Sequence, residues 1–583
     1  MSKMVASELL EPDKSQAALL RGPLDERRLV VAGPGAGKTT VSVLLISEIC
    51  RDSTYSGRPV LYISFSRAAM RAAFGAFGGA DEDGWNGAFD VLPMTMDSFA
   101  WQITEQDHRG SSEWPDFDEV VRLAICSLTE NYSGELDDVA HLIVDEAQDL
   151  SPVRQDLLFA IIERLPSDAG VTIFGDPMQS IYGFLNQDAG NVAQSWRRLL
   201  NGLSARSVTR MYRLDGAHRA HRAGPRKVAS ALLHRDLSDR AGAVESLDDL
   251  MTEFSIWDVP RFVKSAQEWT GSTAVLARTN AEVIGIFQIL ASLGLRCAWN
   301  SPRQVQPRVS SVIAELWSRS RGRALTFEQF REVEAVEPGL SSEWFSLMLS
   351  EVGSGQTVDW SAFARTLDRS VDPSLPWLVG LPDGVVVSTI HRSKGLEWDN
   401  VAVVEGADLL SEFGGRQPEP ELAYVALSRA RKRIVFLECR QPLVVRDKAS
   451  RLYYQPHPKW RRPISIGITP SCLAPKQVGG ESGQRVLAVC DRHAMMEFEL
   501  LASGRAEWPV YRCRIDGLAV GVTSDDFGRG LAKLLGSPRG DWPLLGSVPI
   551  DGVETAWSTV DGARFWLKPR PLGMSAVEYK KEG

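Results

Sequence analysis

The feature that most constrains this chain is the run from Arg28 to Thr40, where an apolar segment breaks into a glycine-rich turn. Residues with helical apolar spacing follow the turn. The glycines Gly33, Gly35 and Gly37 allow backbone angles and close approaches that a Cβ would forbid, so successive N–H groups can face a phosphate chain. The N-terminal end of the following helix adds partial positive charge. A strand, a glycine loop and a helix in this order predict a phosphate-binding loop.

Two side chains at the end of the loop have the chemistry that a nucleoside triphosphate needs. Lys38 would reach the β- and γ-phosphates, and Thr39 would offer its hydroxyl to Mg²⁺. The position usually written as the first glycine of such a loop is Ala32 here. Taken alone, the motif leaves a plain glycine-rich turn open as the alternative.

Length and composition place the chain among ordinary globular proteins of several domains. Single cores seldom grow beyond about 250–300 residues, and this chain has 583. Hydrophobic residues make up 44% and charged residues 24%, as is typical of globular proteins. The sequence contains no run of about 18 apolar residues, so it predicts no membrane span.

Cysteine usage indicates the cellular compartment of the protein, and net charge indicates which kinds of partner it can bind. The seven cysteines are scattered without a CxxC pair, so we expect neither a disulfide framework nor a zinc site. The first residues lack the basic-then-apolar pattern of a secretory signal, and a cytoplasmic protein fits best. The net charge of −9 argues against a protein that coats nucleic acid, but it leaves room for a locally basic groove.

A second chemical signal is the short apolar strand at 141–144, which ends in Asp145 and Glu146. In a parallel sheet, the carboxyl end of such a strand opens beside the phosphate loop. Asp145 can then hold Mg²⁺ through water, and Glu146 can polarise an attacking water. The segment 171–184 repeats this plan with Gln179 in its polar turn.

The rest of the chain divides by its patterns. A second α/β unit is expected from about Ala205, with strand-like segments at 207–213 and 272–278, and it resumes at 384. Helix-like segments between 300 and 380 interrupt it. A basic linker leads to a tail in which Asp516-Gly517 and Asp561-Gly562 predict hairpin turns.

The ordered set of motifs resembles the superfamily 1 DNA helicases of the UvrD, Rep and PcrA type over roughly residues 10 to 440. The motifs are the loop at 32–39 and the segments 145–149, 175–182, 391–397 and 424–430. The resemblance implies an α/β fold with two RecA-like P-loop domains, parallel sheets, helical insertions and a small β-rich C-terminal domain. The boundaries we expect are 1–101 with 141–204 for the first RecA-like domain, 102–140 for a short helical insertion, 205–299 with 381–445 for the second RecA-like domain, 300–380 for a second helical insertion, 446–483 for the basic linker, and 484–583 for the accessory domain.

The resemblance also implies an ATP and Mg²⁺ site in a cleft between the two RecA-like domains. The expected catalytic residues are Lys38, Asp145, Glu146, Gln179, Arg213 and Arg429. The expected nucleotide-binding residues are Gln16, which would read adenine, Gly33, Gly35, Ala36, Gly37, Lys38, Thr39, Thr40 and Glu397, with Thr39 and Asp145 at the metal. An arginine supplied to the γ-phosphate can be worth roughly 10³–10⁵ in turnover, so hydrolysis should require domain closure.

Single-stranded DNA, or DNA with a 3′ tail, is the implied partner, with movement from 3′ to 5′. The residues that match DNA-contacting positions are Phe65, Arg67, Thr95, Ser98, Tyr182, Phe184, Thr389 and His391. From the residues alone, a core position for Tyr182 and Phe184 stays equally open.

Some features depart from the family pattern and keep a second function open. Leu185-Asn186-Gln187 stands where the family usually places an arginine, and Met211 replaces a usual asparagine. The insertions are short, which favours translocation over strand separation. The alternative is a DNA-sensing regulatory ATPase for repair or anti-phage defence, which would switch a partner nuclease bound through the C-terminal domain. We expect no fused nuclease. The E-x-K pattern of such a site is found in the tail only at Glu578-Tyr579-Lys580, where no room is left for the helix that usually supports it.

Overall fold

A computed structural model describes most of the chain as two compact units. The described residues are 11–64, 91–104, 116–130, 134, 136–181, 192–232, 240–300, 308–337, 340–368, 384–412, 417–439, 444–459, 462–501, 507–536, 542–560 and 562–579. Unit 1 comprises Met1–Ser255, Lys394–Asp399 and Gly406–Ile434, and unit 2 comprises Ile256–Ser393, Asn400–Glu405 and Val435–Gly583.

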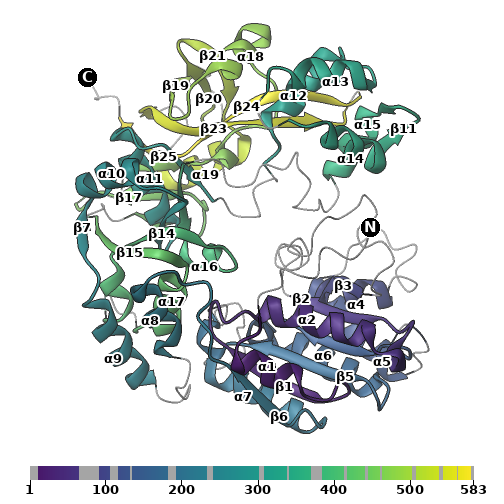
Figure 1. The fold of residues 1–583 in the computed structure, drawn as a ribbon. Helices are drawn as coiled ribbons and strands as arrows, with labels where there is room; N and C mark the ends of the chain where they lie inside the picture. Colours follow the sequence, from purple (N-terminus) through teal and green to yellow (C-terminus); the bar gives the residue numbers. More distant parts are fainter. Residues whose placement is uncertain are drawn as a thin grey trace. The chain divides into compact units, whose positions relative to one another are not determined.

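Unit 1 is built on a six-stranded sheet in which every strand runs parallel to its neighbours (Figure 1). The strands in spatial order are β3 (Val91–Thr95), β2 (Val60–Ser64), β4 (His141–Val144), β5 (Gly170–Gly175), β1 (Arg27–Ala32) and β6 (Arg210–Leu214). β2, β4 and β5 are buried throughout, which explains why they are continuous apolar runs rather than alternating ones.

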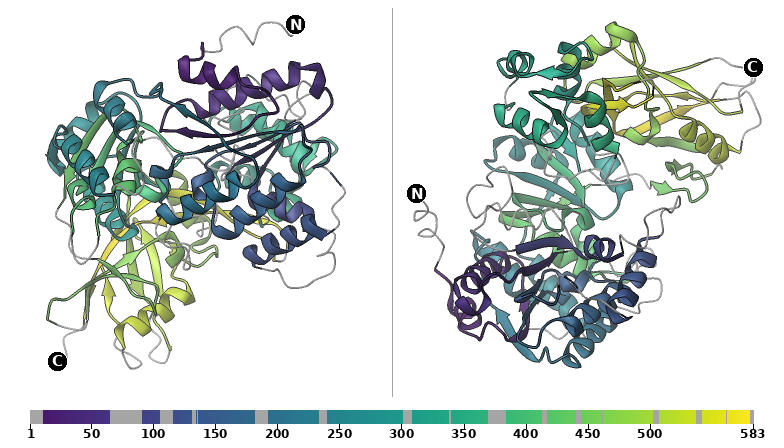
Figure 2. Two further views of the ribbon diagram at one scale, coloured as in Figure 1. Left: turned by 90° about the horizontal axis from the view of Figure 1, so that it is seen from below. Right: turned by 90° about the vertical axis from the view of Figure 1, so that its right-hand side faces the viewer.

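Helices cover both faces of this sheet. Successive residues of a strand point to opposite faces, so Leu29 joins one hydrophobic core and Val30 joins the other. The helices and short helical turns of unit 1 are α1 (Lys14–Leu20), α2 (Lys38–Arg51), η2 (Ser53–Tyr55), α4 (Met96–Thr104), α5 (Phe117–Glu130), η3 (Ala147–Asp149), α6 (Pro152–Arg164), η4 (Pro177–Gln179), α7 (Val192–Ser204), α8 (Ala223–Ala231), α9 (Arg240–Met251), η6 (Gly406–Leu409) and α17 (Pro420–Leu427). The left view of Figure 2 shows the purple helices on one side of the strands and blue helices on the other.

The strand that the sequence placed in the second α/β unit lies in the first sheet. β6 pairs in parallel with β1, with Arg213 opposite Val31. The prediction of a boundary near Ala205 was therefore wrong for this strand. An apolar segment between two α/β units can add to either sheet, and the sequence pattern does not say which.

Unit 2 contains a second largely parallel sheet. Its spatial order is β7 (Ile256–Asp258), β15 (Ala430–Glu438), β14 (Trp398–Val404), β8 (Thr273–Ala277), β13 (Val385–Thr389) and β9 (Cys297–Trp299). The helices α10 (Val259–Glu268), α11 (Asn280–Ser292) and α16 (Ile390–Ser393) connect or cap these strands. The first residues of β14 and β15 are counted with unit 1, so the chain passes between the units along these two strands.

The helical insertion of unit 2 shares a hydrophobic core with the C-terminal hairpin. It contains α12 (Ser311–Arg319), β10 (Leu325–Thr326), α13 (Phe327–Glu334), α14 (Ser342–Val352), β11 (Gly353–Ser354), β12 (Thr357–Val358) and α15 (Trp360–Asp368). Phe565 from the hairpin packs within this core, with its ring centroid 5.1 Å from that of Trp360. Among the residues described, no helix combines the length and apolar character needed to cross a membrane.

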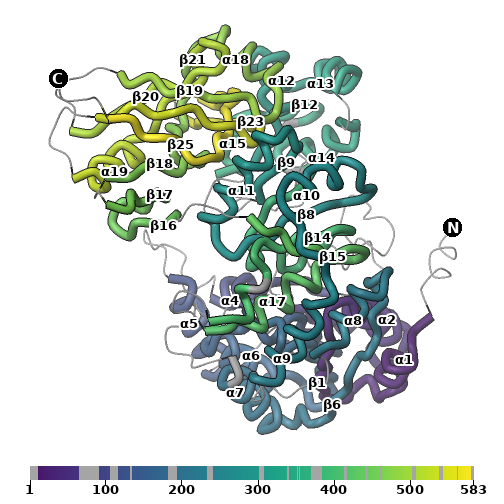
Figure 3. Tube along the Cα trace, turned by 90° about the vertical axis from the view of Figure 1, so that its left-hand side faces the viewer, coloured from purple at the N-terminus to yellow at the C-terminus, as the bar shows by residue number. Residues whose placement is uncertain are grey.

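The tail forms two five-stranded sheets, and the predicted linker is part of them (Figure 3). One sheet has the order β16 (Val445–Arg446), β17 (Tyr453–Pro456), β18 (Pro463–Ile468), β25 (Gly573–Glu578) and β22 (Leu544–Leu545). The other has the order β21 (Leu518–Val522), β20 (Tyr511–Ile515), β19 (Met495–Leu500), β23 (Val548–Ser558) and β24 (Arg564–Pro571). The remaining elements are η7 (Pro470–Cys472), α18 (Gly480–Val489) and α19 (Asp525–Leu535).

The two predicted hairpins are present. β20 and β21 turn at Asp516 and Gly517, which both have positive φ as a type I′ turn requires. β23 pairs with β24 across the second predicted turn. The residues expected to form a linker instead supply β17 and β18. The basic residues that suggested a linker lie outside these two strands, and β18 buries isoleucines of the run Pro463–Ile468 in the sheet.

A buried polar chain crosses three neighbouring strands of the first sheet. Arg28 Nε donates to Thr172 Oγ1 at 3.0 Å, and Thr172 Oγ1 lies 2.9 Å from His141 Nε2. His141 Nδ1 lies 2.9 Å from the Leu24 carbonyl. These contacts fit a neutral imidazole that donates from Nδ1 and accepts at Nε2. Burial, together with the positive charge of Arg28, lowers the pKa of His141 to about 3.

Acid should destabilise unit 1 through His141. Its folded pKa of about 3 lies below the unfolded value, which is about 6.5. The unfolded state therefore binds more protons between these values, and stability falls as the pH falls through this window. We expect His141→Gln to remove about 2 kcal/mol of the loss between pH 7 and pH 5. Urea unfolding at the two pH values measures this.

The matched control is His221→Gln, because His221 is exposed and its ring meets solvent in both states. It should unfold with the pH dependence of the wild type. Equal pH dependence in all three proteins would contradict a buried neutral His141.

Candidate active site

The phosphate loop adopts the backbone geometry that its glycines were expected to supply. β1 ends at Ala32 and α2 begins at Lys38. Gly35 and Gly37 have φ values of 73° and 81°, which side chains with a Cβ rarely adopt. A Cβ at Gly35 would also lie 2.7 Å from the Cβ of Arg219.

The loop is held on two sides by polar contacts. Gln16, buried at the start of α1, donates from Nε2 to the Ala36 carbonyl at 3.0 Å and accepts from the Asp13 N–H at 3.1 Å. The His218 N–H donates to the Gly35 carbonyl at 3.0 Å, and its ring lies 2.7 Å from Asp13. Gln16 is thus fixed against the loop, while its role as an adenine reader stays a prediction.

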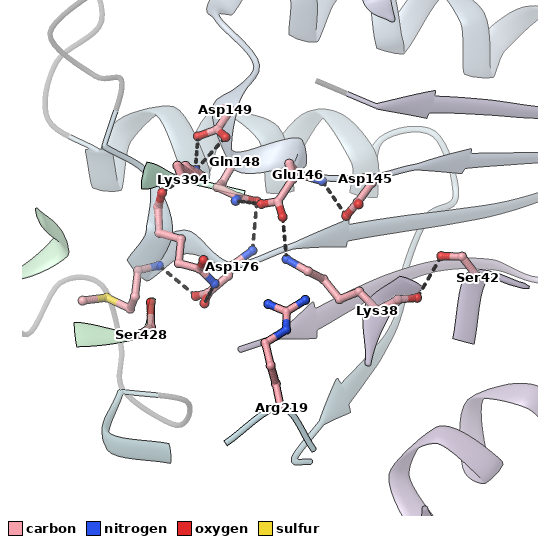
Figure 4. Close-up of polar contacts among 12 residues, drawn as sticks. Lys38, Ser42, Asp145, Glu146, Gln148, Asp149, Asp176, Arg219, Lys394 and Ser428 are labelled. Carbon is pink, nitrogen blue, oxygen red and sulfur yellow. Dashed lines mark hydrogen bonds and ion pairs between the residues drawn. The ribbon is translucent and has the colours of Figure 1, made fainter. Parts of the chain in front are cut away.

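Lys38 reaches the acidic turn that follows β4. Its Nζ lies 3.0 Å from Glu146 Oε1, as Figure 4 shows. Glu146 has a left-handed backbone, with φ 55°, an uncommon conformation for a residue with a side chain and one that clusters at functional sites. The Glu146 N–H donates to Asp145 Oδ1 at 2.9 Å. The structure therefore brings together three of the predicted catalytic side chains.

Opposing electrostatic effects act on this group. Burial lowers the pKa of Lys38, but the carboxylates of Glu146, Asp145 and Asp176 outweigh it and raise the pKa. Burial and repulsion by Glu146 raise the pKa of Asp145. Burial also acts to raise the pKa of Glu146, yet Lys38 and Lys394 lower it overall. Of the two adjacent carboxylates, Glu146 is thus the one whose ionised form the nearby lysines favour most.

Gln148 connects the acidic turn to the turn after β5, and Gln179 lies within that second turn. Gln148 Nε2 donates to Glu146 Oε2 at 2.5 Å, and its Oε1 accepts from the Asp176 N–H at 2.9 Å. Gln179, the predicted γ-phosphate sensor, donates from Nε2 to Asp176 Oδ2 at 2.5 Å. Gln148 thus joins the two turns, and Gln179 holds Asp176 within the second turn.

Arg429 contacts Gln179 within unit 1. Its Nη2 lies 3.3 Å from Gln179 Oε1, and its Nε donates to the Val425 carbonyl at 2.9 Å. The side chain is 3% exposed, and burial lowers its pKa although Glu397 acts in the opposite direction. The structure thus brings Arg429 to the predicted sensor.

Glu397 is held by two arginines. Arg431 Nε lies 3.2 Å from Glu397 Oε2, and Arg219 pairs with the other oxygen. Figure 4 shows Arg219 pointing into the group of side chains around Lys38. The predicted ribose contact of Glu397 stays a prediction.

Arg219 is a residue that the sequence analysis missed, and its position differs from that of Arg213. Arg213 is exposed on β6, in the same sheet as the phosphate loop. It was expected to approach from the second domain, and the pairing of β6 with β1 overturns that expectation. Arg219 follows β6 in a segment without a recognisable motif, so only the folded chain indicates its place.

Lys394 is the second residue that the sequence analysis missed. Its Nζ lies 2.6 Å from Asp149 Oδ2 and donates to the Gln179 carbonyl at 2.6 Å. Burial raises the pKa of Asp149 to about 6, and Lys394 opposes the shift. Lys394 lies inside the motif 391–397, and Asp149 is the last residue of the motif 145–149. That each residue belongs to a motif was the signal available from the sequence.

The donor set suits Mg²⁺ bound together with a phosphate. No group of three or more metal-binding side chains occurs among the residues described. Mg²⁺ usually takes one or two carboxylates and completes its shell with water and substrate phosphates. Asp145, which is 8% exposed, and the Thr39 hydroxyl at the first turn of α2 provide such a set. Thr40 is the next residue of that turn.

Four of the eight predicted DNA-contacting residues are described, and they fall in two places. Thr95 Oγ1 lies 2.8 Å from Ser98 Oγ and accepts from the Ser98 N–H at 3.1 Å, at the start of α4 in unit 1. Thr389 ends β13 and His391 lies in α16, both in unit 2. The predictions for Phe65, Arg67, Tyr182 and Phe184 lie outside the described residues.

Two protein families match segments of this chain. The AAA domain family matches residues 17–185, and the UvrD-like helicase C-terminal domain family matches residues 384–437. These segments contain Lys38, Glu146, Gln179, Lys394 and Arg429.

Two helicases of yeasts are similar in sequence. The F-box DNA helicase protein 1 of Schizosaccharomyces pombe is 25% identical over 327 residues, which cover 51% of this chain and 33% of that protein. The ATP-dependent DNA helicase SRS2 of Saccharomyces cerevisiae is 36% identical over 84 residues, which cover 14% of this chain and 7% of that protein. The chain therefore spans a third or less of the length of these relatives.

Two solved structures show a distant likeness. Bacteroides Pif1 bound to ssDNA is 16% identical with a TM-score of 0.34, covering 73% of this chain and 92% of that one. Pif1 helicase from Candida albicans is 14% identical with a TM-score of 0.33, covering 73% of this chain and 95% of that one.

Replacing Lys394 should strongly destabilise unit 1. The side chains of Lys394 and Asp149 are 9% and 1% exposed, so Lys394→Met leaves a buried carboxylate without its cation. Such a change costs about 3–5 kcal/mol. Thermal unfolding measures the loss, and the double variant Lys394→Met/Asp149→Leu should recover most of it.

The control is Arg485→Met, because Arg485 and Glu481 form an exposed pair. Exposed pairs contribute about 0–1 kcal/mol. If Lys394→Met unfolds at the temperature of this control, the buried pair has no structural role.

Proposed function

We propose that this chain, which belongs to the superfamily 1 DNA helicases of the UvrD type, is an ATP-dependent motor on DNA. It hydrolyses ATP and moves from 3′ to 5′ along single-stranded DNA. This is the direction implied by the resemblance of its motifs to the UvrD, Rep and PcrA type. The observation that carries the proposal is the meeting of Lys38, Glu146, Gln179 and Arg429 in one unit.

The Lys38–Glu146 pair offers a way to make hydrolysis depend on bound ATP. The Lys38 ammonium neutralises the Glu146 carboxylate at 3.0 Å. A triphosphate in the loop would take Lys38 as its partner. Glu146, still oriented by Gln148, would then be free to accept a hydrogen bond from the attacking water.

Asp145 and Thr39 would hold Mg²⁺ beside the phosphates. The ion, when bound, neutralises charge that develops on the transferred phosphoryl group. Asp145 keeps its backbone contact with Glu146, so metal binding and orientation of the base involve adjacent residues.

Gln179 and Arg429 would couple the chemistry to motion. Arg429 hydrogen-bonds the Gln179 side chain, and Lys394 hydrogen-bonds the Gln179 main chain. These two cations come from segments that connect directly to strands of the second sheet. A change at Gln179 on hydrolysis would therefore reach that sheet, whose end carries Thr389 and His391 as proposed DNA contacts. A protein partner of the tail stays a prediction.

The primary test is ATP hydrolysis with and without a single-stranded oligonucleotide. We expect the wild-type chain to be stimulated by DNA and Lys38→Ala to lose measurable turnover. The control Lys227→Ala removes a lysine that pairs with Glu253 at an exposed site of the same unit, and it should retain full activity. Turnover that does not change when DNA is added would contradict a motor.

A second test separates ATP binding from hydrolysis. Arg429→Ala should reduce kcat by about 10³-fold and leave binding of a fluorescent ATP analogue within a few-fold of wild type. Arg429→Lys retains charge without the planar guanidinium, and it should restore only part of kcat. Loss of nucleotide binding in both variants would place Arg429 in a structural rather than a catalytic role. Oligonucleotides that block translocation from one end or the other test the direction.

A further inference from the structure

The segment 444–463 differs in charge from the chain around it. It contains the six basic residues Arg446, Lys448, Arg451, Lys459, Arg461 and Arg462 against the single acidic residue Asp447. Its formal charge is thus +5 in a chain whose net charge is −9. The proposed motor does not use this segment.

The structure describes five of these side chains, and they lie toward the two ends of the short strand β17. β16, β17 and β18 form the outer part of the sheet that continues with β25 (Figure 3). The first basic cluster, Arg446, Lys448 and Arg451, lies in β16 and the turn that precedes β17. Arg446 Nε is 3.4 Å from the Arg451 carbonyl. The second basic cluster, Lys459 and Arg462, lies between β17 and β18.

The cations of both clusters are exposed and lack acidic partners. Among the residues that the structure describes, no ion pair involves any of these five side chains. Asp447 instead accepts from the Ser450 N–H at 2.6 Å. Several other exposed arginines of the tail are paired: Arg485 with Glu481, Arg512 and Arg514 with Glu499, and Arg529 with Asp526. Exposed cations without an ion pair also occur elsewhere among the described residues of the tail, as at Lys476 and Arg564, but in these two clusters several of them lie close together along the chain.

Two tyrosine rings support the guanidinium groups. Arg446 lies over the Tyr453 ring at 5.7 Å, and Arg462 lies over the Tyr579 ring at 4.8 Å. Cation–π contacts of this kind orient the cation. Each guanidinium covers a face of its tyrosine ring, so that face is not open to a base. The contact therefore favours binding of phosphates by the arginines over stacking of bases on the rings.

We propose that the two basic clusters bind the phosphate backbone of duplex DNA. β17 has four residues and therefore separates the clusters by about 13 Å. The major groove of B-DNA is about 12 Å wide, so each cluster can meet one of the two backbones that border it. A single strand offers only one backbone. The inference rests on the proposed function, because the duplex would be the double-stranded part of the motor's tailed DNA substrate.

Binding of a blunt duplex, followed by fluorescence anisotropy at several salt concentrations, tests the proposal. The clusters variant carries Arg446→Gln, Lys448→Gln, Lys459→Gln and Arg462→Gln. Arg451 is left in place because its φ is 61°. Four lost phosphate contacts should reduce the salt slope of log K by about 3.6, and affinity at moderate salt should fall about tenfold or more.

Two further variants separate charge from folding. Arg485→Gln, Arg512→Gln, Arg514→Gln and Arg529→Gln together remove the same charge from paired positions, and this control should bind duplex nearly as wild type does. Lys448→Gln/Lys459→Gln leaves the two tyrosine contacts intact and should lose about half of the salt slope that the clusters variant loses. Equal slopes in the wild type, the clusters variant and the double variant would overturn the proposal.

The test is distinct from that of the motor. The clusters variant should keep the kcat for ATP at saturating single-stranded oligonucleotide. If wild-type protein binds duplex through the clusters but hydrolyses no ATP, the motor fails and this inference stands. If the clusters variant loses binding to phosphatidylserine vesicles while duplex binding is unchanged, the surface recognises lipid and the inference is overturned.

Discussion

Compensation among buried charges at the carboxyl end of the first sheet is the constraint on which the rest of the structure depends. Asp145, Asp149 and Asp176 are each less than one-tenth exposed, and burial raises the pKa of each. Such carboxylates persist only beside cations or hydrogen-bond donors. Lys38 and Lys394 supply the charge from 108 and 245 residues away along the chain, as counted from Glu146 and Asp149. The acidic turns are therefore stabilised only when distant segments have folded around them.

In the proposed motor, this compensation would make the site responsive to a nucleotide. Phosphates would bring negative charge to a place where Lys38 neutralises a carboxylate, so the ligand and Glu146 would compete for one cation. Gln148 contacts both turns directly, and Gln179 contacts Asp176 within its own turn. A change of partner at Lys38 therefore acts on a connected set of side chains rather than on an isolated ion pair.

The sequence predicted the parts of the site that depend on local chemistry. Glycines at the loop and carboxylates at the ends of strands have a meaning that the next few residues settle, and Lys38, Glu146 and Gln179 lie together as that pattern indicated. The pairing of β6 with β1 and the strands within 446–483 were not predicted, because strand pairing is a long-range choice. Arg219 was missed for the same reason, since its partner Glu397 belongs to a distant segment.

Charge is distributed unevenly over the chain, and the unevenness has a physical consequence. A net charge of −9 repels DNA at long range and weakens non-specific contact. Where exposed arginines of the tail sit beside carboxylates, their field is cancelled locally. The cations around β17 have no such neighbours among the described residues, so their attraction for phosphate is not cancelled by a nearby carboxylate. An acidic chain can in this way bind DNA at chosen places without coating it.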